Sequence, residues 1–221
     1  MAFSNLFLHQ CAACHSPIAF RWDFKNLPFC KTCLSYLRPM PEPLFPDLHA
    51  AFYSIGVTHP ILRHWKKHAH SVFEDRIFQS AQPVLDRLRR AHLTQPWDMI
   101  IPIPQRDRRA FHLGGGPARR IAFRIQRELQ IPVQEILLRS DRAALRQAQK
   151  SLHERFESTL EFQIRDDMEI GFSGKRILLV DDLMTSGQTI KQSTQTLRDV
   201  GFGDVCVFVL GYRPHLSKGE T

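Results

Sequence analysis

A chain of 221 residues has room for one α/β domain of ordinary size and one small additional module. Its hydrophobic content of 43%, with 16 phenylalanines, favours a packed core and excludes an intrinsically disordered chain. The formal net charge of +8 points to anionic partners. No apolar run approaches the ~20 residues of a membrane-spanning helix, and no secretion signal is evident, so we expect a cytoplasmic protein without a membrane span.

Four cysteines near the N-terminus form two Cys-x-x-Cys pairs, Cys11 with Cys14 and Cys30 with Cys33, which lie 15 residues apart. This spacing is typical of four thiolates around one Zn²⁺ in a closed, structural site. Disulfides are the alternative, but a cytoplasmic chain disfavours them. We therefore expect a zinc ribbon over residues 1–38 that needs its metal in order to fold.

Four prolines within residues 39–48 predict an extended linker between the ribbon and an α/β domain over residues 49–221. Residues 51–57 have the character of a strand, and a helix should begin near residue 61. Histidines crowd that helix, and we expect a solvated basic helix there and not a metal-binding pair at His64 and His68. A further amphipathic helix over residues 77–88 should bend or restart at Pro83.

Residues 99–104, Met-Ile-Ile-Pro-Ile-Pro, predict a strand that runs into a turn stiffened by proline. The run Gly114, Gly115, Gly116 follows, and Pro117 suits the first turn of a helix that should extend to about residue 129. A strand, a glycine-rich loop and a helix together can hold an anion, so this loop is expected to meet phosphate groups. Another strand is expected over residues 133–138, and Cys206 should lie in a buried strand.

The most informative stretch is residues 176–190. Residues 177–180 form an apolar run typical of a parallel strand buried on both faces, and this strand should end on Asp181 and Asp182. Next comes a loop that leads into a helix, which should stop at Gly201. In an open α/β sheet such a loop lies at the carboxyl edge, where ligands bind. The loop consists of Thr185, Ser186, Gly187, Gln188 and Thr189.

This loop has the chemistry of a phosphate site, because a helix start supplies N–H groups and Gly187 lets an anion approach the backbone. The adjacent carboxylates can accept hydrogen bonds from vicinal hydroxyls or hold a divalent cation. A ribose 5-phosphate fits both features. A receiver domain would need more chain than the 39 residues after Asp182, and a dehalogenase-type phosphatase would need Asp in place of Leu183. A simple acidic turn before a capped helix is the plain alternative.

Residues 176–190 resemble the phosphoribosyl pyrophosphate (PRPP) signature of type I phosphoribosyltransferases. The resemblance implies a parallel sheet flanked by helices, with Asp181 and Asp182 as the catalytic positions facing the ribose 2′ and 3′ hydroxyls. It implies that the loop from Thr185 to Thr189 wraps the 5-phosphate and that Mg²⁺ is bound together with PRPP. The glycines at 114–116 would form the second loop, which meets the other phosphates.

With its four cysteines, the whole chain resembles the competence protein F (ComF) family, which joins a zinc ribbon to a phosphoribosyltransferase-like domain. That family has an Arg-Gly-Phe-Asn-Gln-like segment at the pyrophosphate loop. Here residues 113–117 are Leu-Gly-Gly-Gly-Pro, so only the glycine matches. Arg139, Gln149 and Arg155 resemble the family's Arg…Gln…Arg pattern.

The ComF resemblance implies a role in natural competence, in the uptake of single-stranded DNA at the inner face of the cytoplasmic membrane beside a helicase-like partner. Residues 101–155 hold 12 Lys and Arg against 5 Asp and Glu, which would attract a polyphosphate or a nucleic acid, although a solubilising surface would look the same. An active phosphoribosyltransferase of nucleotide salvage stays open as the alternative. The candidate cationic residues are Arg106, Arg109, Arg139, Arg142, Arg146, Lys150 and Arg155.

Overall fold

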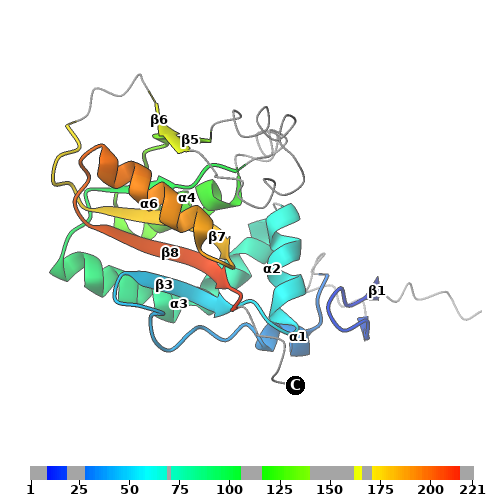
Figure 1. The fold of residues 1–221 in the computed structure, drawn as a ribbon. Coiled ribbons are helices and arrows are strands. Elements are labelled where there is room, and N and C mark those ends of the chain that lie inside the picture. The colour runs from blue at the N-terminus through cyan, green and yellow to red at the C-terminus, as the bar shows by residue number, and fades with distance from the viewer. Residues whose placement is uncertain are drawn as a thin grey trace, which may run out of the picture.

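The computed structural model describes residues 9–18, 28–68, 71–105, 116–139, 162–165 and 171–214 (Figure 1). Its helices are α1 Lys31–Ser35, α2 Thr58–Lys67, α3 Ser71–Thr94, α4 Pro117–Leu129 and α6 Gln188–Asp199. Its strands are β1 His9–Gln10, β2 Pro17–Ile18, β3 Leu48–Tyr53, β4 Met99–Pro102, β5 Leu137–Arg139, β6 Phe162–Ile164, β7 Ile177–Met184 and β8 Val205–Tyr212.

A four-stranded parallel sheet forms the centre of the fold, with the strand order β3-β8-β7-β4. The segment around Val133 extends this sheet at the outer edge of β4. There the Ile100 N–H donates to the Pro132 carbonyl at 2.8 Å, and the Gln134 N–H donates to the Ile100 carbonyl at 2.9 Å.

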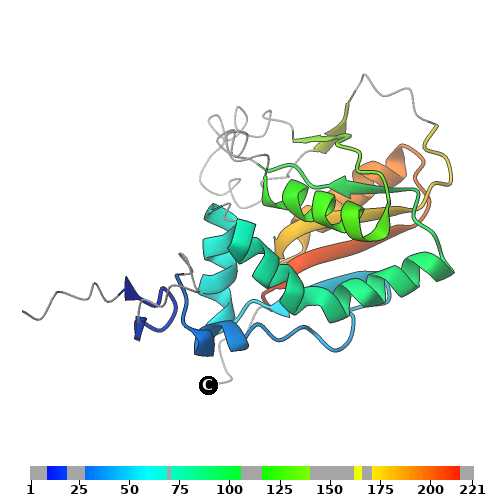
Figure 2. The same cartoon turned by 180° about the vertical axis from the view of Figure 1, so that it is seen from behind.

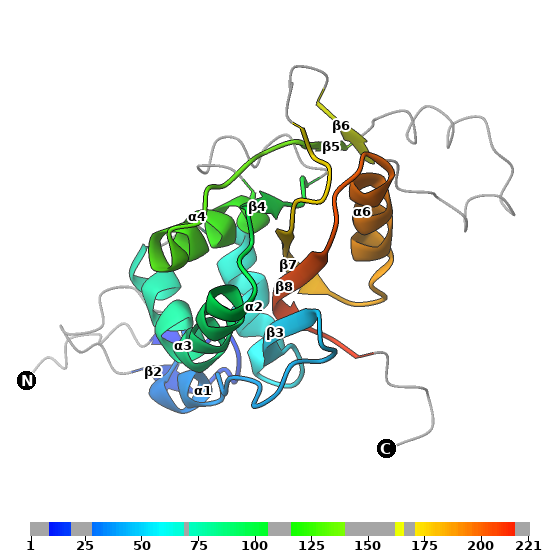
Figure 3. The same ribbon diagram turned by 90° about the vertical axis from the view of Figure 1, so that its left-hand side faces the viewer.

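Helices cover both faces of the sheet, so that the domain has three layers (Figures 2 and 3). The position of β7 in the sheet explains why its first four residues are all apolar. Ile177 and Leu179 are buried in the cluster on the α6 face, whereas Leu178 and Val180 are buried in the cluster with α2, α3 and α4. Because successive strand residues point to opposite faces, a central strand needs apolar side chains at every position.

Helix boundaries follow the expected local signals. Pro117 occupies the first turn of α4, where its missing N–H is not needed, and Gln130 ends the helix in the left-handed conformation. Gly201, with φ 99°, follows α6 as expected. Helix α3 is one element with Pro83 inside it, and it changes direction along its length in Figure 2, so the expected bend is present without a restart.

Three expected elements differ in the structure. Strand β7 does not end on the two carboxylates but continues through them to Met184. The strand expected over 51–57 is β3, which begins and ends earlier because its residues pair with β8 up to Tyr53. Residues 133–138 form no continuous strand: Val133 makes a single bridge to β4, and β5 pairs instead with β6 in a separate antiparallel sheet.

The proline-rich stretch 39–48 packs along the sheet. The Met40 N–H donates to the Ala51 carbonyl at 2.9 Å, and Arg87 of α3 donates to the Met40 carbonyl at 2.6 Å. Met40 is itself buried in the core. The proline-rich stretch therefore attaches to β3 and α3 instead of spanning open solvent.

The N-terminal module, made of β1, β2 and α1, packs beside α2 (Figure 1). Phe29 is buried at the junction, where its ring stacks on Phe73 at 5.4 Å between centroids and meets the His64 ring edge-on at 5.3 Å. The sequence therefore forms the expected α/β fold with a small four-cysteine module at its N-terminal end. Within the described ranges, no helix is both long and apolar enough to cross a membrane.

Candidate functional site

The two expected carboxylates lie at the point where the direction of winding changes in the sheet. Strand β4 connects through α4, on one face, to the segment around Val133 on its outer side. Its other neighbour, β7, leads to α6 on the opposite face (Figure 3). The crevice between β4 and β7 is therefore a topological switch point, where open α/β sheets bind ligands.

Strand β4 is shorter than β7 at this edge. Pro102 is paired with Val180, and the Ile103 N–H donates to the Val180 carbonyl at 2.8 Å. Asp181 and Asp182 therefore lie beyond the end of β4, while β8 still pairs with β7 on the other side. Because neighbouring strand residues point to opposite faces, only a ligand lying across this edge can reach both carboxylates.

Asp182 is buried, with 3% of its surface exposed, and its carboxylate is fully engaged by the protein. Lys66 Nζ lies 2.8 Å from Oδ2, and Gln105 Nε2 donates to the same oxygen at 2.9 Å. The other oxygen accepts the Leu183 N–H at 2.7 Å. The Asp182 carboxylate is thus held in place by one ammonium, one amide and one backbone N–H.

Asp181 has a different environment. Burial, together with the neighbouring charge of Asp182, raises the pKa of Asp181 to about 7, against the lowering effects of the Asp182 N–H, Lys66 and Arg139. Oδ1 of Asp181 accepts the Asp182 N–H at 2.8 Å. The pair therefore combines one carboxylate bonded to three donors of the protein with one whose pKa is raised by burial toward neutrality.

The expected phosphate loop lies between β7 and α6. Gly187 is the N-cap of α6 with φ 74°, a left-handed conformation that favours glycine, and no side chain caps this helix. At the start of the helix, the Gln188 N–H makes only a long hydrogen bond to Ser186 Oγ, at 3.4 Å. Thr185, Ser186 and Gln188 are exposed, and Gly187 and Thr189 are half-buried. An uncapped helix start with exposed hydroxyls can receive an anion.

The second expected loop is described only at its end. Gly116 is the N-cap of α4, and a Cβ atom at this glycine would lie 3.3 Å from Cγ of Gln105. The end of this loop therefore adjoins the glutamine that donates to Asp182. Gly114 and Gly115 lie outside the described residues.

Among the expected cationic residues, Arg139 is described. It ends β5, and its guanidinium carbon lies 5.5 Å from the centroid of the Phe162 ring. The others fall outside the described residues, namely Arg106, Arg109, Arg142, Arg146, Lys150 and Arg155.

The four cysteines of the N-terminal module come together as expected. All four sulfur atoms lie within 4.8 Å of one another, and Cys14 Sγ and Cys30 Sγ are 3.8 Å apart. Tetrahedral Zn²⁺ with Zn–S bonds of about 2.3 Å places its sulfurs about 3.8 Å apart, so the cluster fits such an ion. Hydrogen bonding from Ser16 lowers the pKa of Cys14 to about 6, which favours the thiolate that a metal binds. The cluster can bind a metal ion such as zinc.

A cavity of about 490 Å³ lies elsewhere, between α3 and α4. Two of its arginines are paired with acids of α3: Arg120 Nε lies 3.3 Å from Glu74 Oε2, and Arg124 Nη1 lies 2.9 Å from Asp75 Oδ1. The lining holds four arginines and two acids, but it includes neither the acidic pair of β7 nor the loop before α6, so we do not assign the phosphate site to it. It is lined by Glu74, Asp75, Arg119, Arg120, Phe123, Arg124 and Arg127.

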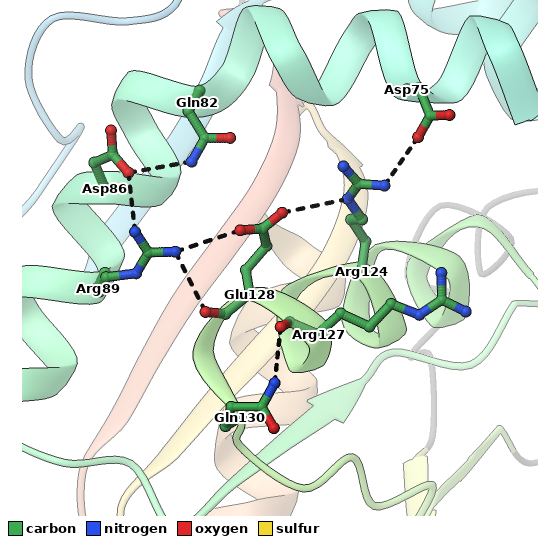
Figure 4. A network of polar contacts seen from close by, with 8 residues as sticks. All are labelled: Asp75, Gln82, Asp86, Arg89, Arg124, Arg127, Glu128 and Gln130. Atoms are coloured by element: carbon green, nitrogen blue, oxygen red, sulfur yellow. Dashed lines mark hydrogen bonds and ion pairs between the residues drawn. The ribbon is translucent and has the colours of Figure 1, made fainter.

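Figure 4 shows how these ion pairs join the two helices. The Glu128 carboxylate of α4 forms ion pairs with Arg89 of α3 at 3.3 Å and with Arg124 of its own helix at 3.7 Å. Arg124 in turn reaches Asp75 of α3. The network clamps α4 against α3 and so fixes the helix that follows the second loop.

Two residues of the site, Lys66 and Gln105, were not predicted from the sequence. Lys66 belongs to the helix that we expected to be a solvated basic helix, although Ile61, Leu62 and Trp65 of this helix are buried. Gln105 follows the predicted proline turn directly, and its polar side chain there was the available signal. Nothing in the sequence indicates that Lys66 meets Asp182, because the contact joins elements far apart along the chain.

Comparison with known proteins places the chain in a family. A family model described as phosphoribosyl transferase domain matches residues 77–218, which is more than half of the chain. No curated protein matches the chain.

Similar solved structures include three phosphoribosyltransferases. A purine phosphoribosyltransferase from Pyrococcus horikoshii Ot3 has 17% identity and a TM-score of 0.37, with 58% of this chain and 69% of that chain covered. Adenine phosphoribosyltransferases from Leishmania donovani and Leishmania tarentolae each have 16% identity, with TM-scores of 0.38 and 0.39. The alignments cover 81% and 77% of this chain, and 92% and 94% of those chains. By the match to the family model, this chain belongs to the phosphoribosyl transferase domain family.

Proposed function

We propose that this chain binds PRPP or a related ribose phosphate at the carboxyl edge of β7, and that it acts as a competence protein F-like protein in the uptake and processing of single-stranded DNA. One observation carries the binding proposal. A buried acidic pair at the topological switch point is followed by an uncapped helix start whose N-cap is Gly187.

Each part of the site has a role in this proposal. The 5-phosphate would receive the first N–H groups of α6 and the hydroxyls of Thr185, Ser186 and Thr189. The ribose would lie across the end of β7, where its 2′ and 3′ hydroxyls could reach Asp181 on one side and Asp182 on the other.

Mg²⁺ would reach the site with PRPP, held chiefly by phosphate oxygens of the ligand, as this ion often is. The acidic pair by itself is poorly suited to chelate the ion. Both oxygens of Asp182 are already bonded within the protein, and burial raises the pKa of Asp181 to about 7, which weakens this carboxyl group as a ligand of a cation. The site therefore fits Mg²⁺ as a companion of the ligand more than as a resident ion.

The proposed part in DNA uptake is supported by domain combination and charge. A four-cysteine cluster is joined to a phosphoribosyl transferase domain, as in the competence protein F family. The excess of Lys and Arg over residues 101–155 would suit a single strand, whose phosphates these cations would neutralise. In this role the protein would work in the cytoplasm, at the inner face of the membrane, beside a helicase-like partner, with zinc as the structural ion of its ribbon.

Isothermal titration calorimetry with PRPP and Mg²⁺ tests the binding proposal. We expect the wild type to bind, and the double variant Asp181→Asn, Asp182→Asn to lose binding at least tenfold, since charge-assisted hydrogen bonds contribute about 1.5–3 kcal/mol each. The matched control is Asp199→Asn, at the far, exposed end of α6. Equal binding by the double variant and the control would show that the site is elsewhere.

Two further assays separate binding from catalysis and test the DNA role. Release of pyrophosphate with any nucleobase would favour the active phosphoribosyltransferase and contradict a purely binding role. Titration of single-stranded DNA at several salt concentrations should show an affinity that falls as salt rises, because phosphate contacts release counterions. No affinity, or one indifferent to salt, would remove nucleic acid from the proposal.

A further inference from the structure

The Lys66 side chain is partly exposed to solvent and contacts the buried Asp182 carboxylate. It is 40% exposed, whereas the Asp182 side chain that it contacts at 2.8 Å is only 4% exposed. Gln105 donates to the same carboxylate oxygen, and the other oxygen accepts a backbone N–H. The group expected to receive ribose hydroxyls is therefore already occupied by the protein's own donors.

The backbone that carries Lys66 is fixed in place. Arg120 of α4 donates from Nη2 to the Trp65 carbonyl at 3.0 Å, and its guanidinium lies 4.7 Å from the centroid of the Trp65 ring. Trp65 Nε1 donates to Glu74 of α3 at 3.1 Å. Because Trp65 is fully buried among these partners, the flexible side chain of Lys66 can move while its helix stays where it is.

A sugar hydroxyl that donates to Oδ2 of Asp182 must displace the Lys66 ammonium from this oxygen. The displaced ammonium is most stable beside another anion. A ligand with hydroxyls alone near this position offers no such anion. A ligand with a pyrophosphate on carbon 1, next to the 2′ hydroxyl, offers several phosphate oxygens within reach of a flexible lysine.

Resting on the proposed function, we propose that Lys66 is a specificity-determining residue that selects sugars phosphorylated on carbon 1, as in PRPP, over ribose 5-phosphate. In the free protein, its ammonium pairs with Asp182 and opposes the binding of a plain sugar phosphate. With PRPP bound, the same ammonium pairs with the pyrophosphate and so offsets the loss of the ion pair. Both effects increase the affinity for PRPP relative to the affinity for ribose 5-phosphate.

The test compares the dissociation constants of PRPP with Mg²⁺ and of ribose 5-phosphate in the wild type and in Lys66→Met. The wild type should prefer PRPP. The preference for PRPP is the dissociation constant of ribose 5-phosphate divided by that of PRPP. In Lys66→Met this ratio should fall at least tenfold, as expected for the loss of one charge-assisted contact. PRPP should bind more weakly than to the wild type, and ribose 5-phosphate as tightly or more tightly. The matched control, Lys67→Met, changes the exposed next lysine of α2 and should keep the wild-type ratio.

An unchanged ratio in Lys66→Met, or an equal fall in Lys67→Met, would overturn the inference while leaving the proposed function intact. Wild-type protein that binds neither ligand would overturn both. Lys66→Gln, which keeps a donor but removes the charge, provides the same comparison if the methionine variant does not fold, and circular dichroism shows which variants are folded. A preference for ribose 5-phosphate in the wild type would also contradict the inference.

Discussion

Leu62 of α2 packs against Gly211 of β8 so closely that a Cβ atom on the glycine would lie 2.7 Å from Leu62 Cδ1. The same Cβ would lie 2.5 Å from Cδ2 of Leu183, which follows the acidic pair in β7. The absence of a side chain at this position therefore sets how near α2 lies to the carboxyl edge of the sheet. That distance in turn allows Lys66 to reach Asp182.

Replacing Gly211 with valine should push α2 away from the sheet. Overpacking of a filled core typically costs about 1–3 kcal/mol, and we expect a loss of this size in the free energy of unfolding, measured by chemical denaturation. Affinity for PRPP should fall as well, because the movement of α2 would carry Lys66 away from the place where it is proposed to pair with the pyrophosphate. The control is Gly171→Val, where a Cβ meets nothing within 4 Å. Equal stability losses in the two variants would contradict the packing argument.

Substitution of Gly187 should impair phosphate binding beyond its effect on stability. Its φ is 74°, and Gly174 has a nearly identical φ of 73° in a place where a Cβ would meet nothing. Valine at either position should cost about 1–2 kcal/mol of backbone strain in the free energy of unfolding. Only Gly187→Val should also lower the affinity for ribose 5-phosphate, which isothermal titration calorimetry measures. If Gly174→Val lowers that affinity equally, the loop is not the phosphate site.

The four-cysteine cluster should bind one zinc ion per chain, which metal analysis of the purified protein measures. Cys33→Ser should lose the ion, and a chelator should unfold the N-terminal module, because structural zinc contributes on the order of 10 kcal/mol to such modules. Cys206 is buried in β8, so Cys206→Ala should keep the zinc even though it disturbs the core. Full metal content in Cys33→Ser would contradict this assignment.

The stability of the wild type should carry a pH dependence that originates at Asp181. Its pKa is raised to about 7 in the folded chain, chiefly by burial, from an ordinary value of 3.8. The folded state therefore binds this proton more tightly than the unfolded state does. The resulting stabilisation is complete below about pH 4 and disappears as pH rises toward 7.

Asp181→Asn cannot titrate at this position. Its free energy of unfolding, relative to the wild type, should therefore rise between about pH 4 and pH 7, by up to a few kcal/mol, and then level off. Urea denaturation across this range measures the difference, and Asp199→Asn shows the effect of losing a carboxylate on the surface. A relative stability that does not change with pH would mean that Asp181 is not a buried, protonated acid near neutrality.

Much of the architecture could be predicted from the amino-acid sequence, because the signals for it are local. The apolar run before Asp181 predicts a strand buried on both faces, Pro117 marks a helix start, and Gly201 marks a helix end. The spacing of the cysteines predicted their cluster in the same way. Each of these features depends on residues close together in the chain, whose preferences act before any distant contact forms.

The surroundings of the acidic pair depend on contacts between distant parts of the chain. Strand β7 continues through both carboxylates because β8 pairs with it to Met184, and no local signal shows how long a neighbouring strand will be. Asp182 meets Lys66 and Gln105, which are 116 and 77 residues away in the chain, and burial in the folded protein raises the pKa of Asp181. Desolvation and ion pairing depend on what surrounds a group in space, so the folded arrangement alone settles them.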